Sequence, residues 1–467
     1  MGTMYLRSLH IRNLKLLRDF RLDFLDSEGQ PRMWTVLLGE NASCKTSILQ
    51  AIALSGSGPA RASQLADIYS LPDKRLEGQR PTVEIEAEFG FSSTFHASRR
   101  YPGLEEHQPS EPPRLQSYLV LRPGRADFGG WSRYLGERSG NDAFDRLVGG
   151  ALPYQLGGPL DEARSQRLPL WFVAGYGTNR HLQPVGVPTA PGGDPGVERL
   201  ESLWGKRPLL GTGFADLFKL HYGDKSWALE YSQVLRDVVE SETAPLPRVR
   251  KLDLRGRGGG GSTANLNESQ RIDFEIGGKL VRLAATQLSQ GYQAMLAWVA
   301  DVIGQVFLEA NDHTEPQDME GLLLIDELDL HLHPRWQIGL VKTLRQIFPR
   351  MQFVTTTHSP MVLPYLHQSE LFLLQPDEEG NITAQPAAQS PAFLTGGGIY
   401  AKFFGLPEIF PPELGDLLWR YGGLWANPRR SPAQDAELSR LRQAIIDAGL
   451  DPGPAAPDVA ASSVVST

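Results

Sequence analysis

The 467-residue sequence contains a single cysteine, Cys44. One cysteine cannot form a disulfide within the chain, which excludes the disulfide framework of many small secreted proteins. The sequence also lacks any run of eighteen apolar residues, and the opening MGTMYLRSLH has the pattern of a strand instead of a signal peptide. We therefore expect a cytoplasmic protein that does not enter a membrane.

The sequence lacks a strong excess of either charge. It has 46 Lys and Arg residues against 54 Asp and Glu residues, a net charge of -8. This balance argues against a wholly basic nucleic-acid coat, although a local basic groove would still fit. No internal repeat and no coiled-coil heptad run occurs, and the length suggests about two to four domain-sized units.

Glycine and proline are abundant and gather in a few segments. The strongest cluster, RGRGGGGSTANLNES at 255–269, has too few apolar residues to pack and is predicted to be a flexible linker. Similar loops are expected at 100–113 and 184–196. The last residues, PDVAASSVVST, have the composition of a disordered end.

The stretch GENASCKTS at 39–47 matches the phosphate-binding pattern G-x-x-x-x-G-K-[ST], except that Cys44 replaces the second glycine. An apolar strand precedes it, and a helix that closes at Gly56 is predicted to follow, which is the context that such a loop requires. Backbone N–H groups would surround the phosphates, Lys45 would supply countercharge, and Thr46 would bind Mg²⁺. The alternative is a chance turn. The nucleotide-binding candidates are Gly39, Asn41, Ala42, Ser43, Cys44, Lys45, Thr46 and Ser47.

Cys44 allows two interpretations. If its position requires a positive φ, a cysteine there costs roughly 1–2 kcal/mol, which a binding site can absorb. In the simpler interpretation the cysteine is a tolerated small residue that points away from the phosphates. In the other, a helix N-terminus and Lys45 favour the thiolate, and Cys44 acts as a redox gate.

A second motif places two carboxylates directly after four apolar residues, 322–325. Such a run suits a parallel strand that is covered on both faces, and open α/β sheets bind ligands at the carboxyl ends of their strands. Asp326 is predicted to bind Mg²⁺ and Glu327 to polarise the attacking water. The alternative is an exposed turn between strand and helix.

The segment after these carboxylates contains two histidines. With Asp329, His331 and His333 could form a metal site, but no recognisable motif supplies the remaining ligands. Pro334 instead opens a helix whose apolar stripe is expected to be core: Trp336, Leu340, Leu344 and Phe348.

Two further motifs occur at the ends of predicted elements. MQFVTTTHS has the pattern of a buried strand that ends in His358, which we interpret as a γ-phosphate contact instead of a structural histidine. LSQG follows a predicted hairpin around Gly277 and opens an apolar helix. Its Ser289 and Gly291 would form an anion-binding helix N-terminus with no obvious anion in the same subunit.

The order P-loop, LSQG, LLLIDE and TTHS resembles the ABC-type ATPases, in the branch of chromosome-maintenance, recombination and OLD-type proteins. IDELDLHLHP and TTHSP are especially similar to stand-alone bacterial ATPases of anti-phage defence systems such as Septu and PARIS. The resemblance covers residues 1 to about 360. It implies an α/β bilobal head with a mixed, mostly parallel sheet, an antiparallel β subdomain and a helical lobe.

The resemblance also implies a function. Two heads would close on ATP and Mg²⁺ as a homodimer or higher homo-oligomer, with LSQG of one completing the P-loop site of the other, and would control an effector such as a nuclease or toxin. Without heptads between P-loop and LSQG, a cohesin-like tether is not expected. No metal-binding Asp-x-Asp cluster follows His358, so an intrinsic nuclease is not expected either. Alternatives are a DNA-maintenance clamp, which would bind nucleic acid, and a scaffold that barely hydrolyses ATP.

The resemblance divides the chain into two predicted parts. The ATPase domain spans 1–395, with a P-loop lobe at 1–56, an insertion and helical lobe at about 57–286, and the signature and switch histidine at 287–395. The extension, 396–467, either docks a partner or packs as a lid. Two residues have weaker assignments: Lys15 is either a nucleotide contact or a solvated strand edge, and Arg180 in FVAGYGTNR is a candidate for the site.

Overall fold

The computed structural model divides into two compact units, residues 1–392 and 393–467, which we describe separately. The predicted linker 255–269 lies outside the described residues, as do most of the loop 100–113 and the end of the chain. Of the predicted loop 184–196, residues 193–196 are described, and its last two residues begin helix α6 (Pro195–Glu198). The described residues are 4–79, 81–91, 113–135, 158–165, 171–180, 193–206, 209–221, 225–240, 246, 248–254, 270–310, 314–406 and 412–453.

The first unit is built around a six-stranded sheet with the strand order β14-β13-β3-β12-β11-β7. All neighbouring strands are parallel except β13 and β14, so the prediction of a mixed, mostly parallel sheet is confirmed. The apolar runs before the P-loop and the carboxylates form central strands that are buried along their whole length, as expected for parallel strands. The strands are β3 (Trp34–Leu38), β7 (Val173–Tyr176), β11 (Gly321–Ile325), β12 (Met351–Thr356), β13 (Leu371–Pro376) and β14 (Ile382–Pro386).

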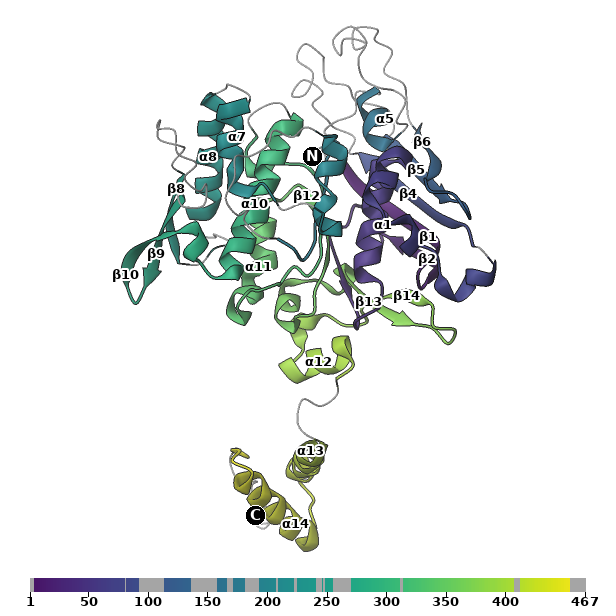
Figure 1. Ribbon diagram of the computed structural model, residues 1–467. Helices are drawn as coiled ribbons and strands as arrows, with labels where there is room; N and C mark the ends of the chain where they lie inside the picture. Colours follow the sequence, from purple (N-terminus) through teal and green to yellow (C-terminus); the bar gives the residue numbers. More distant parts are fainter. Residues whose placement is uncertain are drawn as a thin grey trace. The chain divides into compact units, whose positions relative to one another are not determined.

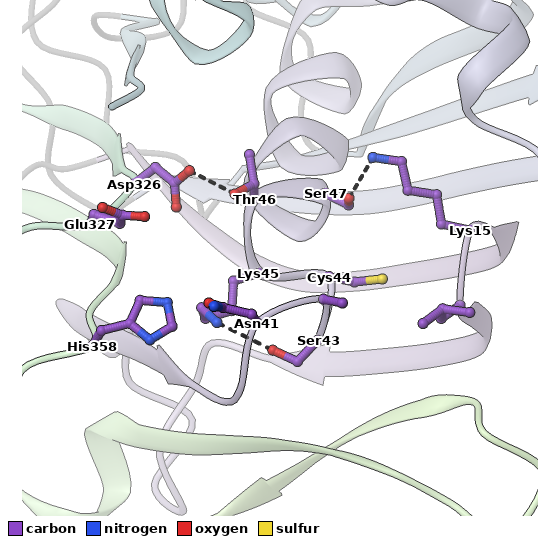
Figure 2. A pocket seen from close by; sticks show the side chains of 12 residues that line it. Lys15, Asn41, Ser43, Cys44, Lys45, Thr46, Ser47, Asp326, Glu327 and His358 are labelled. Atoms are coloured by element: carbon purple, nitrogen blue, oxygen red, sulfur yellow. Dashed lines mark hydrogen bonds between the residues drawn. The ribbon is translucent and has the colours of Figure 1, made fainter. Parts of the chain in front are cut away.

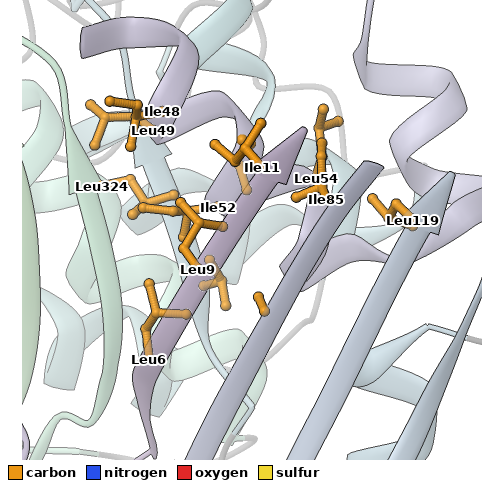
Figure 3. Packing of buried hydrophobic residues seen from close by; sticks show 14 of the residues in the cluster. Leu6, Leu9, Ile11, Ile48, Leu49, Ile52, Leu54, Ile85, Leu119 and Leu324 are labelled. Atoms are coloured by element: carbon orange, nitrogen blue, oxygen red, sulfur yellow. The ribbon is translucent and has the colours of Figure 1, made fainter. Parts of the chain in front are cut away.

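A second sheet is wholly antiparallel and has the order β2-β1-β4-β5-β6. Helix α1 (Lys45–Ser57) contacts strands of both sheets. Its buried face, with Ile48, Leu49 and Ile52, meets Leu9 of β1 and Leu324 of β11 in one apolar core (Figure 3). The helix ends one residue after the predicted Gly56. The strands are β1 (Met4–Leu14), β2 (Leu17–Asp23), β4 (Val83–Phe91), β5 (Arg114–Leu121) and β6 (Gly129–Leu135).

A buried glutamine ties the two sheets together. The Gln352 side chain on β12 accepts a hydrogen bond from the Leu6 N–H at 2.7 Å and donates to the carbonyl oxygens of Leu6 and Arg32 at 3.2 and 2.9 Å. Because each polar group of this amide is matched, its complete burial is not penalised by an unmade hydrogen bond. The hydrogen bonds of Gln352 therefore hold β12 of the parallel sheet against β1 of the antiparallel sheet.

Helices and a small third sheet gather on the other side of the unit (Figure 1). The hairpin predicted around Gly277 is confirmed: Gly277 and Gly278 have φ of 56° and 76°, the left-handed region that a two-residue hairpin turn requires. The LSQG helix and the helix opened by Pro334 are also present. The elements here are α7 (Phe214–His221), α8 (Lys225–Glu240), β8 (Val249–Leu254), β9 (Gln270–Ile276), β10 (Lys279–Ala284), α10 (Gln290–Ala310) and α11 (Pro334–Ile347). Two short helices elsewhere are α2 (Pro59–Leu65) and α5 (Pro159–Ser165).

The described residues of the second unit form three helices, α12 (Gly396–Phe404), α13 (Pro412–Ala426) and α14 (Pro432–Asp447). Helices α13 and α14 share a small core of Tyr421, Leu438 and Ile445. Within the described part of the chain, no helix has the length and apolar character needed to cross a membrane.

Candidate functional site

Three motifs that are far apart in the sequence meet at one edge of the parallel sheet. The P-loop follows β3, the carboxylates follow β11, and His358 comes two residues after the end of β12. Because these strands are parallel neighbours, their carboxyl ends lie together and enclose a cavity of about 370 Å³ (Figure 2). The lining residues are Lys15, Leu16, Asn41, Ala42, Ser43, Cys44, Lys45, Thr46, Ser47, Asp326, Glu327 and His358.

The loop that joins β3 to α1 has an unusual backbone. Ala42 and Cys44 have φ of 68° and 61°, a region that residues with a Cβ rarely adopt. Gly39 is required for a different reason: a Cβ there would lie 2.5 Å from the Ser43 Oγ and 2.9 Å from the Leu374 carbonyl oxygen. Helix α1 begins directly after this loop at Lys45, so its first N–H groups have no partner within the helix and can bind an anion.

The Lys45 side chain folds back onto the loop that precedes it. Its Nζ donates hydrogen bonds to the carbonyl oxygens of Gly39 and Glu40, both at 2.8 Å. Burial lowers the pKa of Lys45, and the negative charges of Asp326 and Glu327 act in the opposite direction. A cation held by carbonyl oxygens at the cavity is suited to a phosphate, which forms stronger charge-assisted hydrogen bonds.

Cys44 directs its side chain away from the rest of the site. In Figure 2 its sulfur lies on the side of Lys15, opposite His358. The side chain packs against the apolar core, as does that of Leu16. Burial raises the pKa of the Cys44 thiol, outweighing a backbone hydrogen bond at Leu16 and the charge of Lys15. This direction disagrees with the thiolate-favouring environment of the redox-gate interpretation and agrees with the simpler interpretation of Cys44.

Asp326 is held between two hydroxyl groups. The Thr46 hydroxyl donates to Asp326 Oδ2 at 2.7 Å, and the Thr356 hydroxyl donates to Oδ1 at 2.6 Å. Thr356 also accepts the Glu327 N–H at 2.7 Å, so one hydroxyl orients both carboxylate-bearing residues. The sequence analysis missed Thr356, although a threonine at the end of a buried strand was a usable signal.

Glu327 has a left-handed backbone, with φ of 49°. Arg180, which follows β7, donates from Nη2 to the Glu327 carbonyl oxygen at 2.6 Å. The guanidinium is almost completely buried, and this burial lowers the pKa of Arg180 to about 10 despite nearby Asp326, Asp329 and Glu327. The weak sequence assignment of Arg180 therefore corresponds to a direct contact with the backbone of a predicted site residue.

Of the remaining predicted site residues, His358 and Lys15 line the cavity, and the two residues of the LSQG motif do not. His358 is exposed and lines the cavity. Lys15 also lines it, and its Nζ donates to the Ser47 hydroxyl at 2.8 Å. Ser289 and Gly291 do not line the cavity. Ser289 is exposed, whereas Gly291 is buried.

Gly291 allows two segments to approach closely. A Cβ at Gly291 would lie 2.4 Å from the His331 carbonyl oxygen, so the start of α10 can meet the loop after β11 only with glycine. The alternative metal site at His331 and His333 gains no support: the described residues contain no cluster of three or more side chains suited to a metal. His333 instead caps α11, where its Nδ1 accepts the Arg335 N–H. In the predicted stripe on this helix, Leu340, Leu344 and Phe348 are buried and Trp336 is half-buried.

Comparison with known proteins finds several similar chains. A family model described as "AAA domain, putative AbiEii toxin, Type IV TA system" matches residues 233–363. The chain is 25% identical over 439 residues to a Septu protein PtuA of Bacillus mycoides (strain KBAB4), which covers 94% of this chain. It is 38% identical over 104 residues to a Retron Ec83 probable ATPase of Escherichia coli, which covers 22% of this chain.

These matches cover only part of the relatives. The aligned region spans 50% of the PtuA protein and 19% of the retron protein. Among solved structures, an SMC head bound to the C-terminal winged-helix domain of ScpA aligns with 82% of this chain and 98% of that chain, at 17% identity and a TM-score of 0.45. The sequence matches support the resemblance to ABC-type ATPases of defence systems that the motifs indicate.

Proposed function

We propose that this chain binds and hydrolyses ATP and acts as a dimerising switch that controls an effector. The observation that carries the proposal is the cavity at the edge of the parallel sheet. The P-loop, two carboxylates and a histidine from separate motifs line it together, whereas Ser289 of the LSQG motif does not. Such a site supports nucleotide binding within one chain and leaves the signature free to serve a second chain.

Five side chains around the cavity have proposed roles in binding or hydrolysis. The N–H groups at the start of α1 and the Lys45 Nζ would bind the phosphates. Thr46 and Asp326 would hold Mg²⁺, which supplies charge stabilisation to phosphoryl transfer when bound; their oxygens lie 2.7 Å apart, and both are the hard ligands that this ion prefers. Glu327 would orient and deprotonate the attacking water, and His358 would contact the γ-phosphate.

The dimer is proposed from the position of the signature. Ser289 is exposed and immediately precedes α10, a helix of 21 residues. Its N-terminal N–H groups would favour an anion, and the ATP phosphates of a second copy fit that requirement. In a symmetric pair each LSQG would meet the other chain's P-loop, so two composite sites would form together.

The effector is proposed from the relatives and from the second unit. Similarity to a Septu protein and to a retron ATPase supports a role in anti-phage defence, with a nuclease or a toxin as the controlled protein. Helices α12, α13 and α14 of the second unit would dock this partner. Exposed Trp419 supports that assignment, because large aromatic side chains are enriched at protein interfaces.

The proposal is tested by comparing ATP turnover and ATP binding in three proteins. The parent should hydrolyse ATP in the presence of Mg²⁺. Glu327→Gln should keep nucleotide affinity within about 3-fold and slow hydrolysis by at least about 10²-fold, since only the base is removed. Lys45→Ala should lose tight binding because the phosphate countercharge is gone.

Two results would contradict this account. Turnover by Glu327→Gln at the parental rate would remove Glu327 from the role of base. A parent that binds ATP and assembles without measurable turnover would indicate a nucleotide-dependent scaffold instead of an ATPase.

A further inference from the structure

Arg180 is a buried cation whose hydrogen bonds are incompletely used. Its side chain is almost fully enclosed, and its Nη2 donates to the Glu327 carbonyl oxygen. Its Nε and Nη1 are also buried and make no hydrogen bond within the described part of the chain. Burying a guanidinium with unmatched donors is unfavourable, so packing alone does not account for an arginine at this position.

The surroundings of Arg180 consist of the acidic residues of the site. The carboxylates of Asp326, Asp329 and Glu327 all act to raise the pKa of Arg180, against the effect of burial. Asp326 and Asp329 are already oriented by hydroxyl groups, from Thr356 and Thr357 respectively. Among the described residues no hydroxyl group donates to the Glu327 side chain, so the placement of this side chain depends on its backbone.

The Glu327 backbone is held in a strained conformation from two sides. A φ of 49° is unfavourable for a residue with a Cβ by roughly 1–2 kcal/mol, so the surrounding contacts must maintain it. Thr356 accepts the N–H of Glu327, and the Glu327 carbonyl oxygen accepts from Arg180 and, at 2.9 Å, from the Leu330 N–H. These hydrogen bonds fix both peptide groups that flank the Glu327 Cα, and Arg180 supplies the one that comes from a side chain to the carbonyl oxygen.

We propose that Arg180 is a positioning residue that fixes the Glu327 carboxylate for hydrolysis by clamping the Glu327 carbonyl group. Arg180 acts through Glu327 and does not contact ATP. This inference rests on the proposed function, because it assumes that Glu327 is the base.

The clamp also connects Glu327 to the helical side of the unit. Tyr176, the last residue of β7, accepts the Asp326 N–H on its carbonyl oxygen at 2.8 Å, and its hydroxyl donates to Asp301 of α10 at 3.1 Å. The strand that precedes Arg180 is therefore bonded both to the carboxylate loop and to the LSQG helix. If α10 moves when two copies close, β7 is bonded to it and would change the position of Arg180.

The test compares Arg180→Met, which keeps the length but removes the donors and charge, with Arg345→Met. Arg345 pairs with Glu370 outside the cavity and controls for the loss of a partly buried arginine in the same unit. Arg180→Met should keep ATP affinity within about 3-fold and lower kcat by about 10- to 100-fold, whereas Arg345→Met should keep kcat within about 2-fold. Arg180→Lys, which keeps the charge if the methionine variant does not fold, should also lower kcat.

A double-mutant cycle separates positioning from a general structural effect. If Arg180 acts through the Glu327 carboxylate, adding Arg180→Met to Glu327→Gln should cause less than about a 2-fold further loss in single-turnover hydrolysis. An equal loss in both backgrounds, a loss of affinity that matches the loss of kcat, or an unchanged kcat would each overturn the inference.

A crystal structure of Arg180→Met keeps this inference separate from the proposed function. The expected result is that Glu327 leaves the left-handed region and that its carboxylate moves. If Glu327 keeps a positive φ and its position, the clamp is not needed and the inference is wrong. This comparison is decisive even if the parent shows no turnover, a result that would overturn the proposed function alone.

Discussion

At the scale of single residues, Cys44 shows how a substituted phosphate-binding loop can be kept intact. Its φ of 61° is the conformation for which glycine is normally selected at this position. The sulfur lies on the side of Lys15, and the side chain packs against the apolar core. The left-handed backbone and the orientation of the thiol together explain how a cysteine fits at this position of the loop.

This explanation predicts a difference between two substitutions at the same position. Cys44→Gly should be more stable than Cys44→Ala by about 1 kcal/mol, because both lose the thiol and only glycine loses the Cβ that opposes a positive φ. Both variants should bind ATP like the parent. Thermal unfolding gives the comparison, and an alanine variant at least as stable as the glycine variant would show that the Cβ is not strained.

The thiol itself provides a second residue-scale prediction. Because burial raises the pKa of Cys44, its thiol should be protonated at neutral pH and alkylate slowly, and its reactivity should rise as the pH approaches that raised pKa. Peroxide should then reduce ATP binding equally in the parent and in Cys44→Gly. A reversible loss confined to the parent would restore the redox-gate hypothesis.

At the scale of elements, the sequence predicted what depends on local pattern. The buried runs of β3 and β11, the hairpin at Gly277 and the helix after Pro334 are each signalled by periodicity or turn residues, and all are present. Parallel pairing then accounts for the convergence of P-loop, carboxylates and His358 at one edge. The roles of Thr356 and Arg180 depend on side chains far apart in the sequence, which no local pattern specifies.

Strand β12 offers a matched pair of substitutions that tests the orientation of the carboxylates. Thr356→Val should destabilise the protein by about 1–3 kcal/mol and lower kcat at least about 10-fold, because it leaves the Glu327 N–H and the Oδ1 atom of Asp326 without their hydrogen-bond partner. Thr355→Val is the control, since its buried hydroxyl makes no hydrogen bond within the described residues. Removing that hydroxyl should be neutral or stabilising. Equal effects of the two changes would contradict the role assigned to Thr356.

Helix α10 provides a test of the composite site. Ser289→Arg spoils the signature and keeps the P-loop, whereas Lys45→Ala does the reverse, so a mixed dimer contains one intact composite site. Each variant should be inactive alone, and activity should partly return when they exchange subunits. If no activity returns although subunit exchange is demonstrated, two explanations remain: hydrolysis requires both composite sites, or Ser289 acts within its own chain. A covalently linked pair of chains that carries only one of the two mutations distinguishes them.

At the scale of the whole molecule, the central claim is that ATP drives two copies together. The most direct measurement is the solution mass of Glu327→Gln, by light scattering after size exclusion, with and without ATP and Mg²⁺. Slow hydrolysis should hold this variant closed, so its mass should at least double with ATP, while Lys45→Ala should keep the same mass in both conditions. A mass of Glu327→Gln that does not change with saturating ATP, under conditions where bound nucleotide is measured directly, would contradict the dimerising switch.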